Sequence, residues 1–211
     1  MSDAKLKLGA IVKTDDRIAV FIDGHATQGA SKSIDLKIDW LKFQILFMEL
    51  GRVRRLGFYL TVPEEIDAND NVDQSSGKPW WKSVVDWMSY NNYKVVLRKG
   101  SEFNFVDTKK IGIKSSVDLA LAVDAMAVAE AVDHIILFTG NSDFIHLVQG
   151  LQAKNIVVTI VSNSFNKMKE LNKVDSNSEA YPFIASKALI KCANNFIDLA
   201  DFQKLITVTT P

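Results

Sequence analysis

Short apolar runs alternate with helical segments along most of the chain, and this alternation restricts the fold more than any other feature. Residues 17–22 (RIAVFI) are rich in β-branched and aromatic side chains and lead into Asp23-Gly24, a pattern typical of a buried strand followed by a turn. Four further segments of similar composition are predicted to be strands: 54–60, 93–99, 134–139 and 155–162. The predicted helices lie between and after them: 35–51, 79–91, 117–132, 142–153 and 186–202.

Strands that alternate with helices predict an α/β fold, because right-handed crossover helices cover both faces of a parallel sheet. We expect a doubly wound, mainly parallel five-stranded sheet with the strand order 3-2-1-4-5. A single domain should span residues 1–211, with its core at about 17–200. Residues 61–78 are polar and lack periodicity, so we expect a mobile surface loop insertion there.

Two of the predicted helices have informative apolar patterns. In residues 35–51, Ile38, Leu41, Ile45 and Met48 recur at helical spacing, and Gly51 supplies the stop. Residues 117–132 (VDLALAVDAMAVAEAV) are apolar on nearly every side. We therefore expect neighbouring elements to cover this second helix well.

Charge and cysteine content limit the class of protein. The 25 basic and 25 acidic residues cancel, so an anionic partner must be held by a local patch and not by the overall field. A single cysteine forms no internal disulfide, and no apolar run approaches the roughly 20 residues that span a bilayer. We expect a cytoplasmic protein without a membrane partner, and the sequence leaves a homodimer open.

Polar residues follow the ends of the first and fourth predicted strands. Asp23 follows the first strand, and Asn141 and Asp143 follow the fourth. The winding of the expected sheet reverses between these strands, and ligands bind at such a point. Asp118, at the start of the 117–132 helix, is the third expected carboxylate. Oxygen ligands without a cysteine or histidine set favour Mg²⁺ or Mn²⁺, so we predict a metal site formed by these three carboxylates and assisted by Asn141.

Asp124, His25 and Ser142 are supporting candidates, and the main site residues also have a purely structural interpretation. Asp124 lies six residues after Asp118, about 240° round a helix, so the two cannot share one face. His25 and Ser142 are close to the predicted site in sequence. Alternatively, Asp23 serves only as a turn residue, and the residues from Asn141 onward only cap a helix and favour its dipole.

Basic residues concentrate shortly before Asp118, where aromatic residues interleave with them. This segment could guide a phosphate backbone towards the acidic site, although its alternating phenylalanines also fit an ordinary edge strand. The candidate RNA-binding residues are Arg98, Lys99, Lys109, Lys110 and Lys114.

The sequence resembles the NYN domain family, bacterial LabA-like proteins included, within the PIN-like nuclease superfamily. The segments that carry the resemblance are VFIDG at 20–24, VDLALAVDAM at 117–126, ILFTGNSDFIHLVQGLQAKNIVVTIV at 136–161 and SKALIKCANNFIDL at 186–199. The resemblance implies a Rossmann-like sheet, an acidic metal site and RNA cleavage, with acidic positions at Asp23, Asp118, Asp124 and Asp143. Two positions depart from the family pattern: GDSDF is GNSDF here, through Asn141, and Ala26 replaces an asparagine.

These observations lead to two main hypotheses of function. The first is a metal-dependent endoribonuclease that uses Mg²⁺ or Mn²⁺ and leaves a 5′ phosphate and a 3′ hydroxyl. The second is a catalytically degenerate domain that binds RNA or regulates, because Asn141 and Ala26 have weakened the metal site. A phosphatase-like enzyme that does not act on nucleic acid is a third hypothesis, compatible with the neutral net charge.

Overall fold

The computed structural model describes residues 3–63, 80–104, 111–114, 117–173 and 183–208. Its strands are β1 (Arg17–Asp23), β2 (Arg52–Pro63), β3 (Tyr93–Asn104), β4 (Ile111–Lys114), β5 (His134–Phe138), β6 (Val157–Ser162) and β7 (Asn195–Asp198). Its α-helices are α1 (Asp3–Ile11), α2 (Gly24–Ser33), α3 (Trp40–Leu50), α4 (Trp80–Tyr90), α5 (Val117–Val128), α6 (Ile145–Gln152), α7 (Phe165–Glu170), α8 (Lys187–Cys192) and α9 (Gln203–Ile206). Three 3₁₀ turns complete the described elements: η1 (Ala129–Ala131), η2 (Ser142–Phe144) and η3 (Leu199–Phe202).

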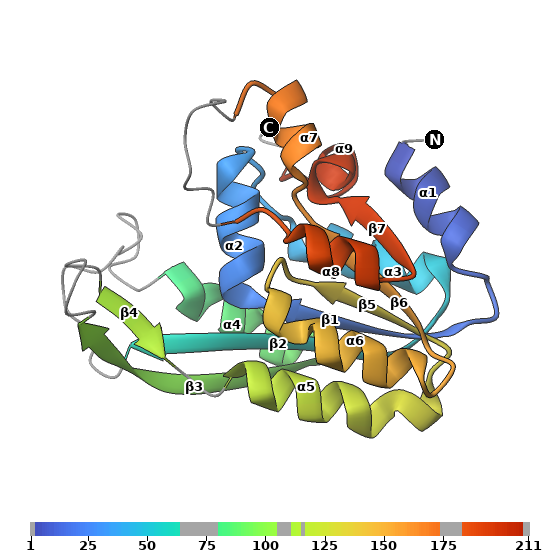
Figure 1. Cartoon of the computed structure of the whole chain (residues 1–211), viewed down its shortest axis with the longest axis horizontal. Coiled ribbons are helices and arrows are strands. Elements are labelled where there is room, and N and C mark those ends of the chain that lie inside the picture. The colour runs from blue at the N-terminus through green and yellow to red at the C-terminus, as the bar shows by residue number, and fades with distance from the viewer. Residues whose placement is uncertain (1–2, 64–79, 105–110, 115–116, 174–182, 209–211) are drawn as a thin grey trace.

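The described strands form one sheet in the order β4-β3-β2-β1-β5-β6-β7, with helices on both faces (Figure 1). All neighbours pair in parallel except β3 and β4, which are antiparallel. The five predicted strands correspond to β1, β2, β3, β5 and β6, so the expected order 3-2-1-4-5 is confirmed. The described sheet has two additional edge strands, β4 and β7.

The strand β7 replaces part of a predicted helix. We expected residues 186–202 to form one amphipathic helix, but α8 ends at Cys192 and the chain then extends beside β6. Asn194 makes this turn, because its backbone N–H donates to the Val158 carbonyl and its side-chain oxygen accepts from the Val158 N–H. The pairing partner, which is distant in sequence, therefore overrides the helical pattern.

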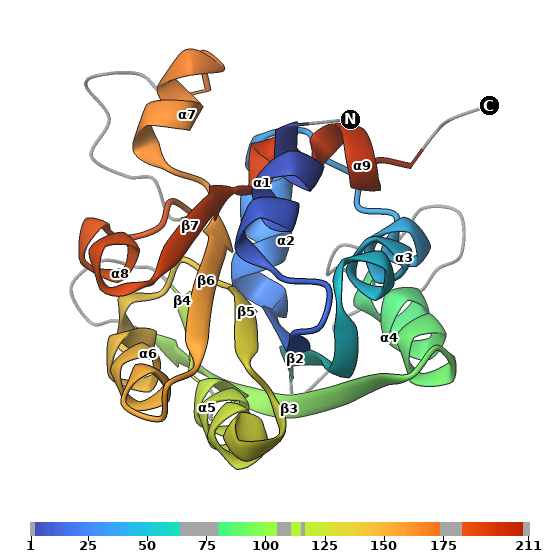
Figure 2. The same ribbon diagram turned by 90° about the vertical axis from the view of Figure 1, so that its right-hand side faces the viewer.

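Two hydrophobic cores lie on opposite faces of the sheet because successive strand residues alternate in direction. Ile18, Val20 and Ile22 of β1 face a core covered by α1, α3 and α4, whereas Ala19 and Phe21 face α5, α6 and α8. Figure 2 shows these two layers of helices on either side of the strands.

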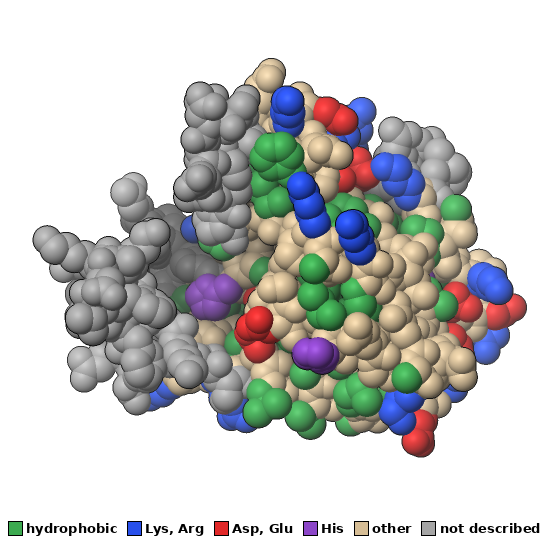
Figure 3. All heavy atoms as spheres, viewed as in Figure 1, with side chains coloured by type: hydrophobic (Ala, Val, Ile, Leu, Met, Phe, Trp, Pro, Cys, Tyr) green, Lys and Arg blue, Asp and Glu red, His purple; other side chains and the backbone are tan. Residues whose placement is uncertain are grey.

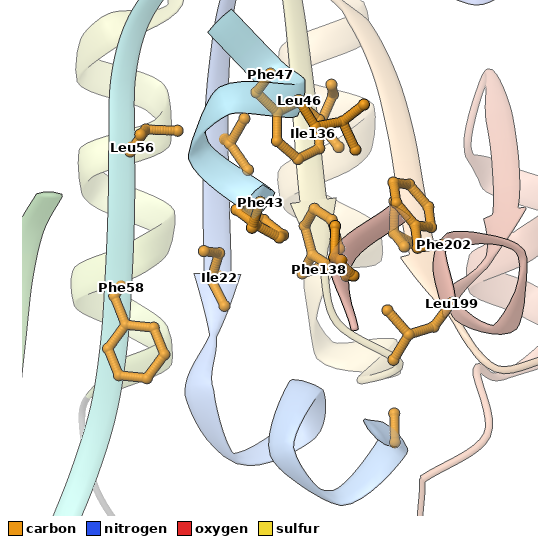
Figure 4. Packing of buried hydrophobic residues seen from close by; sticks show 14 of the residues in the cluster. Ile22, Phe43, Leu46, Phe47, Leu56, Phe58, Ile136, Phe138, Leu199 and Phe202 are labelled. Atoms are coloured by element: carbon orange, nitrogen blue, oxygen red, sulfur yellow. The ribbon is translucent and has the colours of Figure 1, made fainter. Parts of the chain in front are cut away.

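Aromatic packing dominates the first core. Phe43 of α3 lies 5.1 Å from Phe138 of β5 between ring centroids, and Phe138 in turn packs edge-on against Phe202, as Figure 4 shows. Removing one such buried ring costs about 3–5 kcal/mol, so these side chains hold α3 and the C-terminal segment to the sheet.

Helix α3 exposes the apolar stripe that its sequence displays. In α3 the buried residues are Phe43, Gln44, Leu46, Phe47 and Leu50. Leu41, Ile45 and Met48, whose spacing predicts the helix, are 52%, 45% and 59% exposed and therefore do not face the core.

The expectation that neighbours cover the 117–132 helix is wrong for α5. Among the described residues, only Val117, Leu121 and Ala125 of this helix are buried. Leu119 and Val123 remain exposed because α5 rests on the sheet along one side only.

The turn expected after Asp23 is the beginning of α2. A Cβ at Gly24 would lie 2.9 Å from the Tyr59 carbonyl oxygen and 2.9 Å from Leu60 Cδ1. A side chain at this position would therefore push the first turn of α2 away from β2.

Two other expectations concern residues 61–78 and membrane-spanning helices. The segment 61–78 was expected to be a mobile loop; β2 continues to Pro63, and residues 64–78 lie outside the described residues. No described helix combines the length and the apolar character needed to cross a membrane.

Candidate active site

The candidate site lies where β1 and β5 end side by side. Asp23 is the last residue of β1 and is 7% exposed. Its Oδ1 accepts from the Ala26 N–H at 3.1 Å, which caps α2, and its Oδ2 accepts from Thr139 Oγ1 at 2.9 Å. Burial raises the pKa of Asp23, although both hydrogen bonds oppose this shift. Asp23 is thus fixed in orientation by two elements of the fold.

Asn141 connects the turn after β5 to the first turn of α5. Its Oδ1 accepts from the Asp143 N–H at 3.0 Å and caps η2, while its Nδ2 donates to Asp118 Oδ2 at 3.3 Å. Its own backbone N–H donates to Thr139 Oγ1 at 3.2 Å. The amide side chain therefore serves both as the helix cap that we considered and as a contact within the site.

The three carboxylates predicted from the sequence lie in one cluster. Burial raises the pKa of Asp118, and the nearby negative charges of Asp23 and Asp143 raise it further. Asp118 and Asp143 also line the same hollow between α5 and α6. We call Asp23, Asp118, Asn141 and Asp143 the acidic cluster; its role in metal binding stays a prediction.

The carboxylates of the acidic cluster do not all point at one position. Within the described part of the chain, no group of three His, Cys, Asp or Glu side chains is arranged to hold a single ion. Mg²⁺, however, commonly keeps several waters and takes only one or two carboxylates directly. The oxygen donors of the cluster are compatible with that mode of binding.

His25 and Ser142 border the acidic cluster. His25 Nε2 lies 2.8 Å from the Thr61 carbonyl oxygen, so this nitrogen carries the proton of that hydrogen bond. The ring lies close enough to Asp23 and Asp118 for a positive charge on it to lower the pKa of both carboxyl groups. Ser142 is exposed in η2, directly after Asn141.

Asp124 lies on a different side of α5 from the acidic cluster. Its Oδ2 accepts from Tyr59 Oη at 2.7 Å and pairs with Lys94 Nζ at 2.6 Å. Burial raises the pKa of Asp124, but the hydrogen bonds from Lys94 and Tyr59 outweigh this effect and lower it overall. Burial and the bond to Asp124 raise the pKa of Tyr59. Asp124 therefore joins α5 to β2 and β3.

The candidate RNA-binding residues are described only in part. Arg98 and Lys99 are exposed on β3. Lys114 ends β4, but its side chain lies outside the described residues, as do Lys109 and Lys110 altogether.

Sequence reasoning missed the partners that hold the carboxylates in place. Thr139 bonds both Asp23 and Asn141, and the only sequence signal was a hydroxyl at the last position of the fourth predicted strand. Tyr59 and Lys94 carried no signal, because their relation to Asp124 depends on how α5 lies across the sheet.

Comparison with known proteins identifies the family. The NYN domain profile matches residues 17–200, while a search of curated proteins finds no match. The fold is similar to the crystal structure of VPA0982, a protein of unknown function from Vibrio parahaemolyticus RIMD 2210633. The TM-score is 0.57 and the sequences are 19% identical, over 89% of this chain and 94% of that one. The chain belongs to the NYN domain family, a family of PIN-like nucleases.

Proposed function

We propose that the chain is a metal-dependent endoribonuclease whose acidic cluster holds Mg²⁺ or Mn²⁺. The observation that carries this proposal is the proximity of Asp23, Asp118 and Asp143. Among the described residues, no lysine or arginine forms an ion pair with any of the three. Like charges held this close disfavour ionisation, and a bound divalent cation would offset their repulsion.

The chain contributes oriented oxygen ligands to this reaction. Asp23 is held by Thr139 and the first turn of α2, and Asp118 is held by the Asn141 amide. Asp143 is exposed, so a phosphodiester can approach it from solvent. When bound, the cation would lower the pKa of a water ligand and stabilise charge that develops at phosphorus. In-line attack would leave a 5′ phosphate and a 3′ hydroxyl.

RNA is the proposed substrate, and basic side chains on β3 support this choice. Arg98 and Lys99 are exposed on β3, and Arg98 lines a hollow together with Leu119 and Ala120 of α5. Their charges would attract the phosphate backbone in spite of the neutral net charge of the chain. The remaining candidates, Lys109, Lys110 and Lys114, are proposed on sequence alone.

A catalytically degenerate RNA-binding module is the second candidate function. The observation that favours it is the Asn141 side chain, which presents an N–H group to Asp118 and adds no negative charge. An amide donor stabilises Asp118 without a cation, so the cluster would bind a metal more weakly than one with a fourth carboxylate.

Cleavage of labelled single-stranded RNA in Mg²⁺, Mn²⁺ or EDTA tests the proposed activity. We expect cleavage by the wild type with metal and none after Asp143→Asn. Asp86→Asn is the matched control, because Asp86 is exposed on α4 and lies outside the cluster. RNA binding without cleavage in any metal would support the degenerate module instead. Hydrolysis of a small phosphate ester without action on RNA would support the phosphatase-like hypothesis.

Location and assembly remain separate predictions. We expect a cytoplasmic protein, and the mass of the purified chain in solution would decide whether it forms a homodimer.

A further inference from the structure

Helix α5 exposes an apolar ridge that begins directly after the acidic cluster. The ridge consists of Leu119, Val123 and Met126, which are 65%, 58% and 36% exposed and recur every three to four residues. Figure 3 shows hydrophobic side chains gathered along this edge of the face that carries α5 and α6. A contiguous exposed apolar surface of this kind commonly marks a binding site.

A hollow of about 600 Å³ lies between this ridge and α6. Its apolar walls come from Leu119, Val123 and Met126 on one side and from Phe144 and Leu147 on the other. Its polar side chains are Asp118, Asp143 and His146. The volume is in the range of small-molecule sites, which typically combine apolar walls with a few polar groups.

The far end of the hollow is bordered by a glycine. A Cβ at Gly150 would lie 3.7 Å from Met126 Sδ, so a larger side chain there would extend into the space beside the ridge. The hollow therefore extends along α5 from the acidic cluster towards Gly150.

A second hollow, of about 400 Å³, lies on the other side of the same ridge. Leu119 and Val123 line it together with Lys94 and Arg98. Lys94 is paired with Asp124, whereas Arg98 is exposed and forms no ion pair with any described residue. The ridge thus separates two carboxylates from an available guanidinium group.

We infer that the apolar ridge of α5 is a nucleoside-binding platform for the substrate strand. A base would lie in the hollow between α5 and α6, against Val123, and an adjacent phosphate would bind Arg98. The base fits this hollow because its walls are apolar and a base is uncharged, whereas the adjacent phosphate finds a cation in Arg98 on the other side of the ridge. This inference rests on RNA as the proposed substrate. It adds a subsite that binds a nucleotide with a base more tightly than an abasic one.

The ridge places an apolar surface beside the charged Arg98, and this arrangement favours RNA over a protein as its binding partner. A nucleotide strand presents an apolar base face and an anionic phosphate at each step, and the ridge offers an apolar surface beside a cation. A second protein would need to leave Arg98 solvated or supply a carboxylate for it.

Binding of labelled single-stranded RNA to substituted proteins tests the platform without relying on cleavage. Val123→Ser should weaken binding about fivefold, because the substitution removes apolar surface that the base would cover. Ala127→Ser is the matched control, because Ala127 is exposed on the same helix and lines neither hollow. We expect it to change binding less than twofold.

Abasic substitutions in the RNA isolate the base contact. Removing one base at a time should reveal a position where wild-type binding falls about fivefold, and Val123→Ser should abolish that difference. Arg98→Gln should reduce the slope of log affinity against log salt by about 0.7, as expected for one lost phosphate contact. Arg54→Gln, another exposed arginine, should leave the slope unchanged.

The outcomes separate the platform from the proposed function. If the wild type binds RNA but Val123→Ser responds to abasic RNA as the wild type does, the platform is wrong and the proposed function stands. If the wild type binds no RNA, both fail. If Val123→Ser changes the mass in solution while RNA binding per chain is unchanged, the ridge is a protein interface and the platform is wrong.

Discussion

Asn141 donates a hydrogen bond from Nδ2 to Asp118 Oδ2, so an amide contacts the carboxylate whose pKa the charges of Asp23 and Asp143 both raise. This contact stabilises the charge on Asp118, and the pKa of Asp118 is nevertheless raised by burial and by Asp23 and Asp143. The negative charges of the acidic cluster therefore repel one another, and one neutral hydrogen-bond donor does not offset this repulsion.

Asn141→Asp should strengthen divalent-ion binding roughly tenfold, because it adds a negative charge next to Asp118; tenfold corresponds to about 1.4 kcal/mol. The cap on η2 should survive, because aspartate caps helices as well as asparagine does. Calorimetric titration with Mn²⁺ measures the affinity, and RNA cleavage measures the consequence. Activity that appears only in this variant would identify the natural chain as a degenerate nuclease, and equal Mn²⁺ affinity in both proteins would contradict a ligand role for position 141.

Asp118→Asn should increase the free energy of unfolding in EDTA at pH 7. The folded state raises the pKa of Asp118, so its ionised form costs stability above the ordinary aspartate range. The gain should disappear at low pH, where the carboxyl group is protonated in both the folded and unfolded chains. Urea unfolding at several pH values measures it, and a loss of stability at pH 7 would contradict the crowding of charges.

Asp124→Asn should have the opposite effect and cost about 1 kcal/mol at neutral pH, the upper range for a solvent-accessible ion pair. Its pKa is lowered overall by Lys94 and Tyr59, so the stabilisation is present at neutral pH and is lost as pH falls through the folded-state pKa. The same urea experiment measures it. RNA cleavage should be largely retained, and complete inactivation of a fully folded Asp124→Asn protein would show that Asp124 belongs to the reaction after all.

His134 should make the fold sensitive to mild acid. Burial lowers the pKa of His134 to about 4, and the side chain is only 1% exposed at the start of β5. Because the unfolded chain binds a proton near pH 6.5 and the folded chain does not, stability should fall by about 2 kcal/mol between pH 7 and pH 5. Thermal or urea unfolding of His134→Gln should lack this component, whereas His146→Gln, at an exposed position on α6, should retain it.

The exposed stripe of α3 should tolerate charge although its sequence looks like a core pattern. Ile45→Glu should cost less than about 0.5 kcal/mol, as is usual for surface positions. Phe47→Ala, two residues later on the buried face, should cost about 3–5 kcal/mol. Urea unfolding compares them, and a large loss in Ile45→Glu would show that this stripe is covered in solution.

The central part of the fold could be predicted because it depends on local pattern and general connection rules. Alternating strands and helices imply right-handed crossovers, and these bring the ends of β1 and β5 together. Asp23 and Asn141 could therefore be placed near each other although they lie 118 positions apart in the sequence. Asp118 followed from its position at the start of a helix.

The remaining features depend on contacts that sequence spacing does not encode. The residues of β7 continue a helical pattern, and their parallel pairing with β6 makes them a strand. The apolar composition of α5 predicts burial, yet the number of neighbours available to cover a helix is a property of the assembled sheet. Thr139 is a site residue because its hydroxyl lies 2.9 Å from Asp23 Oδ2, a contact that the sequence does not encode.

The two aspartates of α5 also restrict how the length of this segment can change. Asp118 must face the acidic cluster while Asp124 must reach Tyr59 and Lys94, and one inserted or deleted residue would rotate one of them by about 100° relative to the other. Between these positions the chain should accept substitutions that keep position 121 apolar and buried and the ridge apolar, but no insertion or deletion. Related sequences should therefore keep the spacing of six between these two aspartates, even where the loops before the helix differ in length.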